Sequence, residues 1–572
     1  MANKSLFESN KVTKNRTHST TPAAETKNAA GGNAYLFTDR HALAQIACTN
    51  CFNSTYYVDA SANLDIAKKA VAALKSDPEF IAKVAIFCRQ KAYMKDMPAY
   101  LTAVLATIDT KLFRKVFRKV IDNGKMLRNF IQIGRSGQAG KVLNVSSGAV
   151  RHAVNEWFKS RSSDSIFRAS IGNDPSMRDI LRMAHPKPDT IEKAALFAYL
   201  KGAEYDDKNG DFITRNKDGS VKYIQKFVNL PQVVQNYEIF KKNHGEIPNV
   251  DFRLLDSFLT KDEARAMWAS QARNAGWTAT RMNLNNYCKY GVFEDKTLVE
   301  IVAQRLGNKE LIQKSKSYPY QLMTAYSATE ANVPNAISEA LQDAMEIALE
   351  NIPDFSGQIK ICVDTSGSMS SAVTGNRGSV TSVVRCVDVA ALFAASVLRK
   401  NKSAEILPFD TRVHTAKFNP RDTVITNAKK LASYGGGGTD CACALRHLNQ
   451  SGSKADAVIF VSDCESWVDS GYSSWYNRGT GMMNEWNIFK EKNPNAKLIC
   501  IDLTPRQNSQ VKEHKDILQV GGFGDQVFDV VNSFIQFGNS SDHWVDMIDA
   551  ININDDEVFV ENQQKCEIGV ND

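Results

Sequence analysis

The chain has 572 residues, of which 43% are hydrophobic and 23% are charged, as in an ordinary globular protein. This composition excludes a disordered chain, and the length excludes a small fold held together by disulfides. No uncharged apolar run reaches the roughly 18 residues of a membrane span, and the first residues lack the apolar core of a signal peptide. The eleven cysteines are scattered and odd in number, which favours a reducing, cytoplasmic setting.

The formal net charge of +7 is distributed unevenly. Residues 1–350 hold 49 basic and 36 acidic side chains, whereas residues 351–572 hold 21 and 27. The excess is densest at 111–151, where ten basic residues accompany a single acid, Asp122. This density indicates a surface that binds a polyanion such as nucleic acid, although a solvated helix face is the alternative interpretation.

The first part of the chain is predicted to be a tail followed by a helical domain. Residues 1–34 contain few large apolar side chains and are expected to form a disordered tail. Over 35–352 the apolar residues recur at helical spacing with short polar links, which is typical of stacked helix pairs. The segment 111–121 is the clearest case, because its apolar and basic residues lie on opposite faces. Two turn dipeptides, Asn209-Gly210 and Asp218-Gly219, predict an inserted hairpin or loop at 205–223.

The remainder, 353–548, has the pattern of an α/β domain. Four short apolar runs each end at an acid: 359–364, 404–410, 457–463 and 498–502. Most are separated by stretches long enough for helices, so we expect a doubly wound parallel sheet. Ligands of such sheets bind beyond the carboxyl ends of the strands, where these acids lie. The last residues, 549–572, are expected to form an acidic tail.

Five oxygen-bearing residues are predicted to converge at that edge: Asp364, Ser366, Ser368, Thr439 and Asp463. The first three stand at alternate positions after a strand, so in an extended loop their side chains point the same way. The fourth follows four glycines, and the fifth ends another strand. Oxygen ligands with few formal charges suit Mg²⁺ or another divalent cation. Ordinary turn chemistry is the alternative, and it accounts less well for the complete set.

Other candidates carry less weight. Cys48 and Cys51 have no second pair nearby, so we interpret them as packing residues rather than as half of a zinc site. A nucleophile elbow and a phosphate-binding loop of the Walker type are both missing from the sequence. Two convergent carboxylates are also too few for a two-metal nuclease. We therefore do not expect an enzyme.

The motifs resemble those of known families. The five oxygen residues resemble the metal-ion-dependent adhesion site of the von Willebrand factor A family, and all five positions match. Upstream, the segments 134–137, 147–158 and 179–188 resemble the TROVE module of the Ro autoantigen family, and 436–441 is also similar to that family. This resemblance covers about residues 35–545.

The resemblance implies an architecture and a function. TROVE helices would form a HEAT-like repeat ring that an A domain completes, and the chain would act as a monomer. Single-stranded 3′ ends of misfolded small non-coding RNAs would enter a basic central hole, and a Y-like RNA would bind the outer surface. Such a protein acts in RNA quality control, where bacterial relatives use a Y RNA to tether a 3′–5′ exoribonuclease such as polynucleotide phosphorylase.

Charge and resemblance together select twelve candidate RNA-binding residues: Lys115, Arg118, Lys119, Arg135, Lys141, Arg151, His152, Arg168, Arg178, Arg182, His185 and Lys187. His185 matches a histidine that the family uses for RNA, although a capping or packing role before Pro186 is equally consistent. Where the family carries a Lys/Arg-rich helix, residues 165–171 hold only Arg168. A Y-like RNA would therefore depend on other basic residues.

A second hypothesis assigns the chain to a different class. The A domain would act as a magnesium-dependent protein–protein adaptor that binds an acidic side chain, and RNA binding would be incidental.

Overall fold

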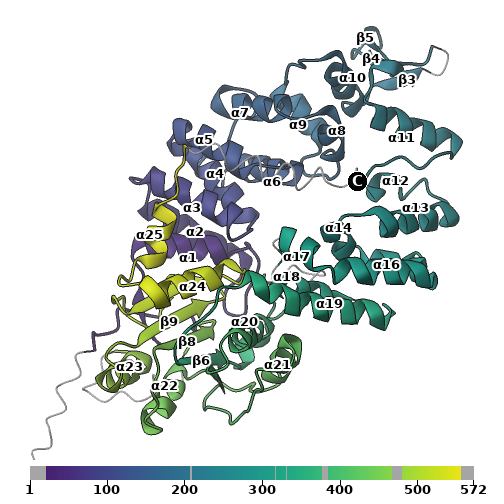
Figure 1. The fold of residues 1–572 in the computed structure, drawn as a ribbon. Coiled ribbons are helices and arrows are strands. Elements are labelled where there is room, and N and C mark those ends of the chain that lie inside the picture. Colours follow the sequence, from purple (N-terminus) through teal and green to yellow (C-terminus); the bar gives the residue numbers. More distant parts are fainter. Residues whose placement is uncertain are drawn as a thin grey trace, which may run out of the picture. The chain divides into compact units, whose positions relative to one another are not determined.

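The computed structural model describes residues 21–206, 209–315, 317, 319–329, 332–376, 384–466 and 479–554 (Figure 1). These residues form two compact units, and each is assembled from separate stretches of chain. One unit combines the residues up to Ala70 with Lys316–Ser327 and Met345–Met547. The other combines Val71–Ser315, Ala328–Ala344 and the residues from Ile548 onward. The units therefore do not follow the expected boundary near residue 353.

The first unit contains a five-stranded parallel sheet in the order β11-β9-β8-β6-β7. Its strands are β6 (Ile359–Asp364), β7 (Glu405–Phe409), β8 (Ala457–Ser462), β9 (Lys497–Asp502) and β11 (Ile517–Gly521). The parallel sheet and its first four strands are confirmed. The fifth was not predicted, because a polar residue, Gln519, stands at its centre. Chain order reverses at β6, between β7 and β8, and this switch point is where open α/β sheets bind ligands.

Helices cover both faces of the sheet, as predicted for a doubly wound fold (Figure 1). They are α20 (Cys386–Lys400), α21 (Val424–Leu431), α22 (Cys441–Gln450), α23 (Gly481–Lys492) and α24 (Gln526–Phe537). On one face Leu445 and Trp486 share a core with Phe460. On the other, Phe393 of α20 stacks on Phe528 of α24 with ring centroids 4.7 Å apart. Neighbouring strand residues point to opposite faces, so β8 contributes side chains to both cores.

The amino-terminal residues also belong to this unit, which corrects two expectations. Strands β1 (Thr26–Lys27) and β2 (Asn33–Leu36) lie within the expected tail, and β2 pairs with β10 (Asn508–Ser509). Helix α1 (Asp39–Thr49), expected in the helical domain, packs on β11, where His41 Nε2 lies 2.9 Å from the Gln519 carbonyl oxygen. These pairings join residues more than 400 positions apart, so no local pattern indicates them. Residues 1–20 lie outside the described part.

Helices make up most of the second unit, as predicted (Figure 1). In chain order the helices from α2 to α19 are α2 (Ala60–Ala73), α3 (Pro78–Gln90), α4 (Asp96–Ile108), α5 (Thr110–Val120), α6 (Gly124–Arg135), α7 (Gly148–Lys159), α8 (Ser163–Arg168), α9 (Met177–Ala184), α10 (Ile191–Leu200), α11 (Gln232–Asn243), α12 (Phe252–Leu255), α13 (Lys261–Asn274), α14 (Trp277–Met282), α15 (Leu284–Lys289), α16 (Lys296–Leu306), α17 (Lys309–Lys314), α18 (Pro319–Ala328) and α19 (Asn335–Ala348). Successive helices pack on one another, for example α3 on α4 and α4 on α5. Most of α2, nearly all of α18 and the end of α19 lie in the first unit.

The predicted insertion is a small antiparallel sheet of three strands rather than two. Its strands are β3 (Glu204–Asp206), β4 (Asp211–Arg215) and β5 (Val221–Lys226). Gly210 and Gly219 have positive φ angles of 68° and 83° in the two connections. The turn dipeptides thus mark both reversals of the chain, because glycine adopts these angles without a steric cost.

Short 3₁₀ helices and one last α-helix complete the described elements: η1 (Phe227–Asn229), η2 (Val292–Glu294), η3 (Leu349–Asn351), η4 (Gly367–Ser370) and α25 (His543–Asp549). None of the helices within the described ranges is long and apolar enough to cross a membrane. Of the expected acidic tail, residues 549–554 are described, whereas 555–572 lie outside the described part.

Candidate functional site

Helix α5 carries the densest basic surface of the second unit. Asp109 caps its first turn by accepting hydrogen bonds from the Lys111 and Leu112 amides. Its apolar face packs Phe113 and Phe117 against Phe130 of α6, with ring centroids 5.2–5.9 Å apart. This anchored face leaves a row of exposed basic side chains on the other: Lys111, Arg114, Lys115 and Arg118. The amphipathic helix expected at 111–121 is therefore confirmed.

Helices α5 and α7 enclose a pocket of about 860 Å³. It is lined by Lys111, Arg114, Lys115, Phe117, Arg118, Lys119, Ile121, His152, Ala153, Glu156, Trp157, Ser160, Arg161, Ile553 and Asn554. Six of these side chains are permanently cationic and one is acidic. The pocket includes four of the twelve predicted residues: Lys115, Arg118, Lys119 and His152. The single acid of 111–151, Asp122, pairs with Arg89 at 2.6 Å and does not line the pocket.

The pocket also contains a basic residue that the sequence analysis missed. Arg161 lies over the Trp157 ring with its guanidinium carbon 4.0 Å from the ring centroid, and it donates a 2.8 Å hydrogen bond to the Asp122 carbonyl. Burial lowers the pKa of Arg161 to about 10, so the group remains charged at neutral pH. The spacing of Trp157 and Arg161 by one helical turn was the available signal, since it favours this stacking.

Four further predicted residues gather around α9. His185 ends this helix in a left-handed conformation, with φ 45° and ψ 54°, and its side chain is exposed. Arg151 of α7 donates a 3.0 Å hydrogen bond to the carbonyl oxygen of Ala184, the residue before His185. Arg178 packs against Gly202, and Arg182 donates to the Lys201 carbonyl at 3.4 Å. Arg151 and Arg182 thus stabilise local backbone, whereas the imidazole of His185 faces solvent.

The other four predicted residues do not line the pocket. They are exposed and lie on separate elements: Arg135, Lys141, Arg168 and Lys187. Arg135 ends α6, and Arg168 ends the short α8. The predicted set therefore separates into the α5–α7 pocket, the group around α9 and these isolated side chains.

The five predicted metal ligands lie at the carboxyl edge of the parallel sheet, and all are buried. Asp364 ends β6, where its Oδ1 accepts from the Ser366 amide at 2.8 Å. The hydroxyls of Ser366 and Ser368 lie 3.2 Å apart. Asp463 follows β8, and the hydroxyl of the preceding Ser462 donates to Asp364 Oδ2 at 2.6 Å. Strand pairing thus joins the two acid-bearing ends, as the sequence pattern predicted.

The glycine-rich loop docks directly on the Asp364 loop. The Gly436 amide donates to the Thr365 carbonyl at 2.8 Å, and the Gly367 amide donates to the Gly437 carbonyl at 2.9 Å. A Cβ atom on Gly435, whose φ is +86°, would lie 2.1 Å from the Thr365 carbonyl oxygen. Only glycine permits this approach. The contact brings the buried Thr439 to the same edge.

The donor set fits a divalent cation. Burial and the charge of Asp463 raise the pKa of Asp364, and burial raises the pKa of Asp463. Oδ1 of Asp463 is buried and has no hydrogen-bond partner among the described residues. Two buried carboxylates beside the serine hydroxyls form an oxygen-only site, whose charge Arg506 offsets only in part, and a hard cation suits such a site.

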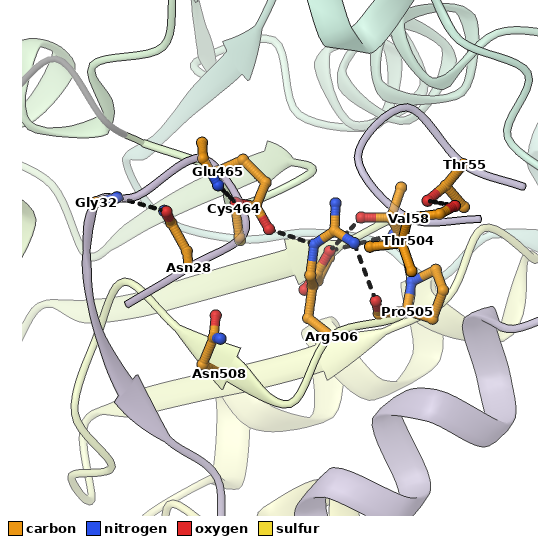
Figure 2. Close-up of polar contacts among 12 residues, drawn as sticks. Asn28, Gly32, Thr55, Val58, Cys464, Glu465, Thr504, Pro505, Arg506 and Asn508 are labelled. Carbon is orange, nitrogen blue, oxygen red and sulfur yellow. Dashed lines mark hydrogen bonds and ion pairs between the residues drawn. The ribbon is translucent and has the colours of Figure 1, made fainter. Parts of the chain in front are cut away.

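A buried arginine lies behind these acids. Figure 2 shows the guanidinium of Arg506, which forms an ion pair with Glu465 and donates to the Pro505 carbonyl at 3.1 Å. Burial lowers the pKa of Arg506, but the negative charges of Glu465, Asp502 and Asp463 outweigh burial and raise it above its usual value. The sequence analysis missed this residue, because a lone arginine after a strand carries no signal of its partners.

The amino-terminal segment completes this network (Figure 2). The Ala30 amide donates to Glu465 Oε2 at 2.9 Å, and the Asn28 side chain donates to the Ser466 carbonyl at 2.8 Å. Gly32 in turn donates its amide to Asn28 Oδ1 at 2.7 Å. The loop after β8, which carries Asp463, is therefore bonded to residues near the start of the chain.

Comparison with known proteins agrees with this architecture. Residues 358–535 match the family model of the Ro60 vWA domain. The chain is 23% identical over 542 residues to RNA-binding protein RO60 of Deinococcus radiodurans, a match that covers 89% of this chain and 95% of that protein. The A domain therefore matches the Ro60 vWA model, and the chain is similar over most of its length to a Ro protein.

Two further matches were found, of which the solved structure shows a likeness of fold. RNA-binding protein RO60 of Caenorhabditis elegans is 20% identical over 399 residues, which cover 59% of each chain. The crystal structure of the Deinococcus radiodurans RO (RSR) protein has a TM-score of 0.58 at 19% identity and covers 87% of this chain and 99% of that one. The relatives are named as RNA-binding proteins rather than as enzymes.

Proposed function

We propose that this chain binds RNA and takes up single-stranded 3′ ends of misfolded small non-coding RNAs in RNA quality control. The observation that carries the proposal is the α5–α7 pocket, where six permanent cations and His152 surround a space of about 860 Å³. The printed names of the Ro relatives support the same class of ligand.

The pocket suits a single strand for two reasons. Its cations neutralise phosphates, which gives salt-sensitive affinity with little sequence preference. Its planar groups, His152 and the guanidinium of Arg161, offer faces on which unpaired bases stack. In a base-paired stem, neighbouring bases cover the faces of each base, so these bases cannot stack on the protein. We therefore infer a preference for an unpaired end, and we assign a Y-like RNA to the exposed His185 and the basic residues around α9.

The test compares a small structured RNA with and without a single-stranded 3′ tail. We expect the tailed RNA to bind more tightly, and its affinity to fall steeply between about 50 and 200 mM salt. The variant Lys111→Gln/Lys115→Gln/Arg118→Gln removes three exposed cations of the pocket. A matched control, Lys261→Gln/Lys296→Gln/Lys314→Gln, removes three exposed charges elsewhere. Equal affinity of the two RNAs would contradict end capture, and equal loss in both variants would contradict a role of the pocket.

We further infer that Asp364, Ser366, Ser368, Thr439 and Asp463 hold Mg²⁺. The unpartnered Oδ1 of Asp463 and the raised pKa values of both carboxyl groups support this site. Mg²⁺ or Tb³⁺ titration of the purified protein tests it, and Asp364→Asn should weaken binding at least about tenfold, since metal affinity follows ligand charge.

A metal-dependent adaptor is the second candidate, and the same buried oxygen site favours it. A bound cation with an open position would accept a carboxylate from a protein such as a 3′–5′ exoribonuclease. Asp364→Asn would then abolish capture of that partner and leave RNA affinity unchanged. Loss of RNA affinity in the same variant would instead assign the site to RNA phosphate.

A further inference from the structure

We propose that the acidic segment 555–572 binds the α5–α7 pocket of its own chain and competes there with RNA. The inference rests on the proposed function of the pocket and adds a means of regulating it. Three observations carry it: the path of residues 549–554, the charge of the residues that follow, and the lining of the pocket.

Residues 549–554 lead the chain directly into the pocket. Asp549 Oδ1 accepts a 2.9 Å hydrogen bond from Lys83 of α3. Ile553 is 7% exposed and lines the pocket beside Asn554. Oδ1 of Asn554 accepts a 2.7 Å hydrogen bond from Lys115 Nζ. Asn554, the last described residue, is therefore already hydrogen-bonded to the basic face of α5.

The next residues are acidic. Asp555, Asp556 and Glu557 follow Asn554 directly, and segment 555–572 as a whole holds six acids and one lysine. Consecutive Cα atoms are about 3.8 Å apart. The Cα atoms of these three acids can therefore be at most about 11 Å from that of Asn554, which is itself bonded to Lys115.

The composition after these acids matches the remainder of the lining. Val558-Phe559-Val560 provides apolar side chains, and the pocket includes the apolar Phe117, Ile121 and Ala153 beside its cations. A segment tethered at the pocket has an effective concentration in the millimolar range, so weak contacts suffice to occupy it. RNA must displace the segment before it can bind. The apparent RNA affinity is therefore the affinity of the open pocket multiplied by the fraction of molecules in which the pocket is open.

The experiment uses the full chain, a chain that ends at Asn554, and the full chain with Asp555→Asn/Asp556→Asn/Glu557→Gln. Each is titrated with a fluorescein-labelled oligouridylate at low salt. We expect the shortened chain to bind at least about tenfold more tightly than the full chain, with the neutralised chain in between. Equal dissociation constants for all three chains would overturn the inference.

A second measurement keeps this inference separate from the RNA proposal. A labelled synthetic peptide of residues 555–572 should bind the shortened chain, and Lys111→Gln/Lys115→Gln/Arg118→Gln should remove that binding. The control Lys261→Gln/Lys296→Gln/Lys314→Gln should retain it. If no chain binds oligouridylate, the proposed RNA function of the pocket fails. The peptide result still shows whether segment 555–572 binds the α5–α7 pocket. A peptide that does not bind, or that binds both variants equally, would contradict the inference.

Discussion

Arg506 and Glu465 form an ion pair that is almost completely removed from solvent, with side-chain exposures of 4% and 0%. The pair lies directly behind Asp463 and is bonded through Glu465 to the amide of Ala30. The negative charges of Asp463 and Asp502 also raise the pKa of Arg506 and so favour its charged form. One buried arginine therefore compensates several acids at the carboxyl edge of the sheet.

Arg506→Met should destabilise the A domain by about 3–5 kcal/mol, because removing one partner leaves buried carboxylates uncompensated. Chemical denaturation measures the loss, and Arg421→Gln, at an exposed arginine, is the control. We expect Mg²⁺ to restore part of the stability of Arg506→Met, since a divalent cation replaces the missing positive charge. A variant as stable as the parent protein would show that the acids do not depend on Arg506.

Gly435→Ala should disrupt the docking of the glycine-rich loop, because its Cβ would collide with the Thr365 carbonyl. Gly436→Ala is a matched control: its φ of +107° is equally unfavourable for alanine, but no atom lies within 4 Å of the added Cβ. Backbone strain alone costs of order 1–3 kcal/mol. The expected result is a larger loss of stability and of divalent-cation affinity for Gly435→Ala than for Gly436→Ala. Equal losses would mean that strain, and not the close approach to Thr365, requires glycine here.

Asp525 should make the A domain less stable as pH rises. Burial raises the pKa of Asp525 from 3.8 to about 8, so folding takes up a proton between these values. The stability of the folded state then falls with increasing pH in this window, by about 1.4 kcal/mol per pH unit for a fully shifted group. Asp525→Asn, which is neutral throughout, should remove this part of the slope in denaturation curves at pH 5 and pH 8. The control is Asp354→Asn, at a carboxylate that is 88% exposed, and a slope unchanged in Asp525→Asn would refute the assignment.

Asn28→Ala should destabilise the A domain by about 1–3 kcal/mol, although Asn28 stands far from it in sequence. The substitution leaves the buried Ser466 carbonyl and the Gly32 amide without their hydrogen bonds, and unsatisfied buried groups carry this cost. Asn495→Ala is a control, since Asn495 is an exposed asparagine of the same domain. Thermal unfolding of the two variants gives the comparison, and a similar melting temperature for both would argue against a stabilising contact.

Much of this architecture could be predicted from local patterns. Helical spacing identified α5 and its basic face, and short apolar runs that end in acids identified β6 to β9. The order of Asp364, Ser366, Ser368, Thr439 and Asp463 indicated an oxygen site at one sheet edge, because parallel strands bring their carboxyl ends together. The metal itself stays a prediction. The fold brings only four of the twelve predicted RNA-binding residues into the α5–α7 pocket. Arg151 and Arg182 instead donate hydrogen bonds to backbone carbonyls around α9.

Local patterns determine which stretches become helices and strands, and which faces are basic or apolar, because these properties depend on residues a few positions apart. They could not reveal that β2 pairs with β10, that α1 packs on β11, or that Arg506 meets Glu465 beneath Ala30. They also could not show that Arg161 and Asn554 line the pocket of α5. Each of these relationships joins distant residues through packing and buried charge pairing. Only the tertiary structure decides which of many equivalent polar residues become neighbours in a low-dielectric interior.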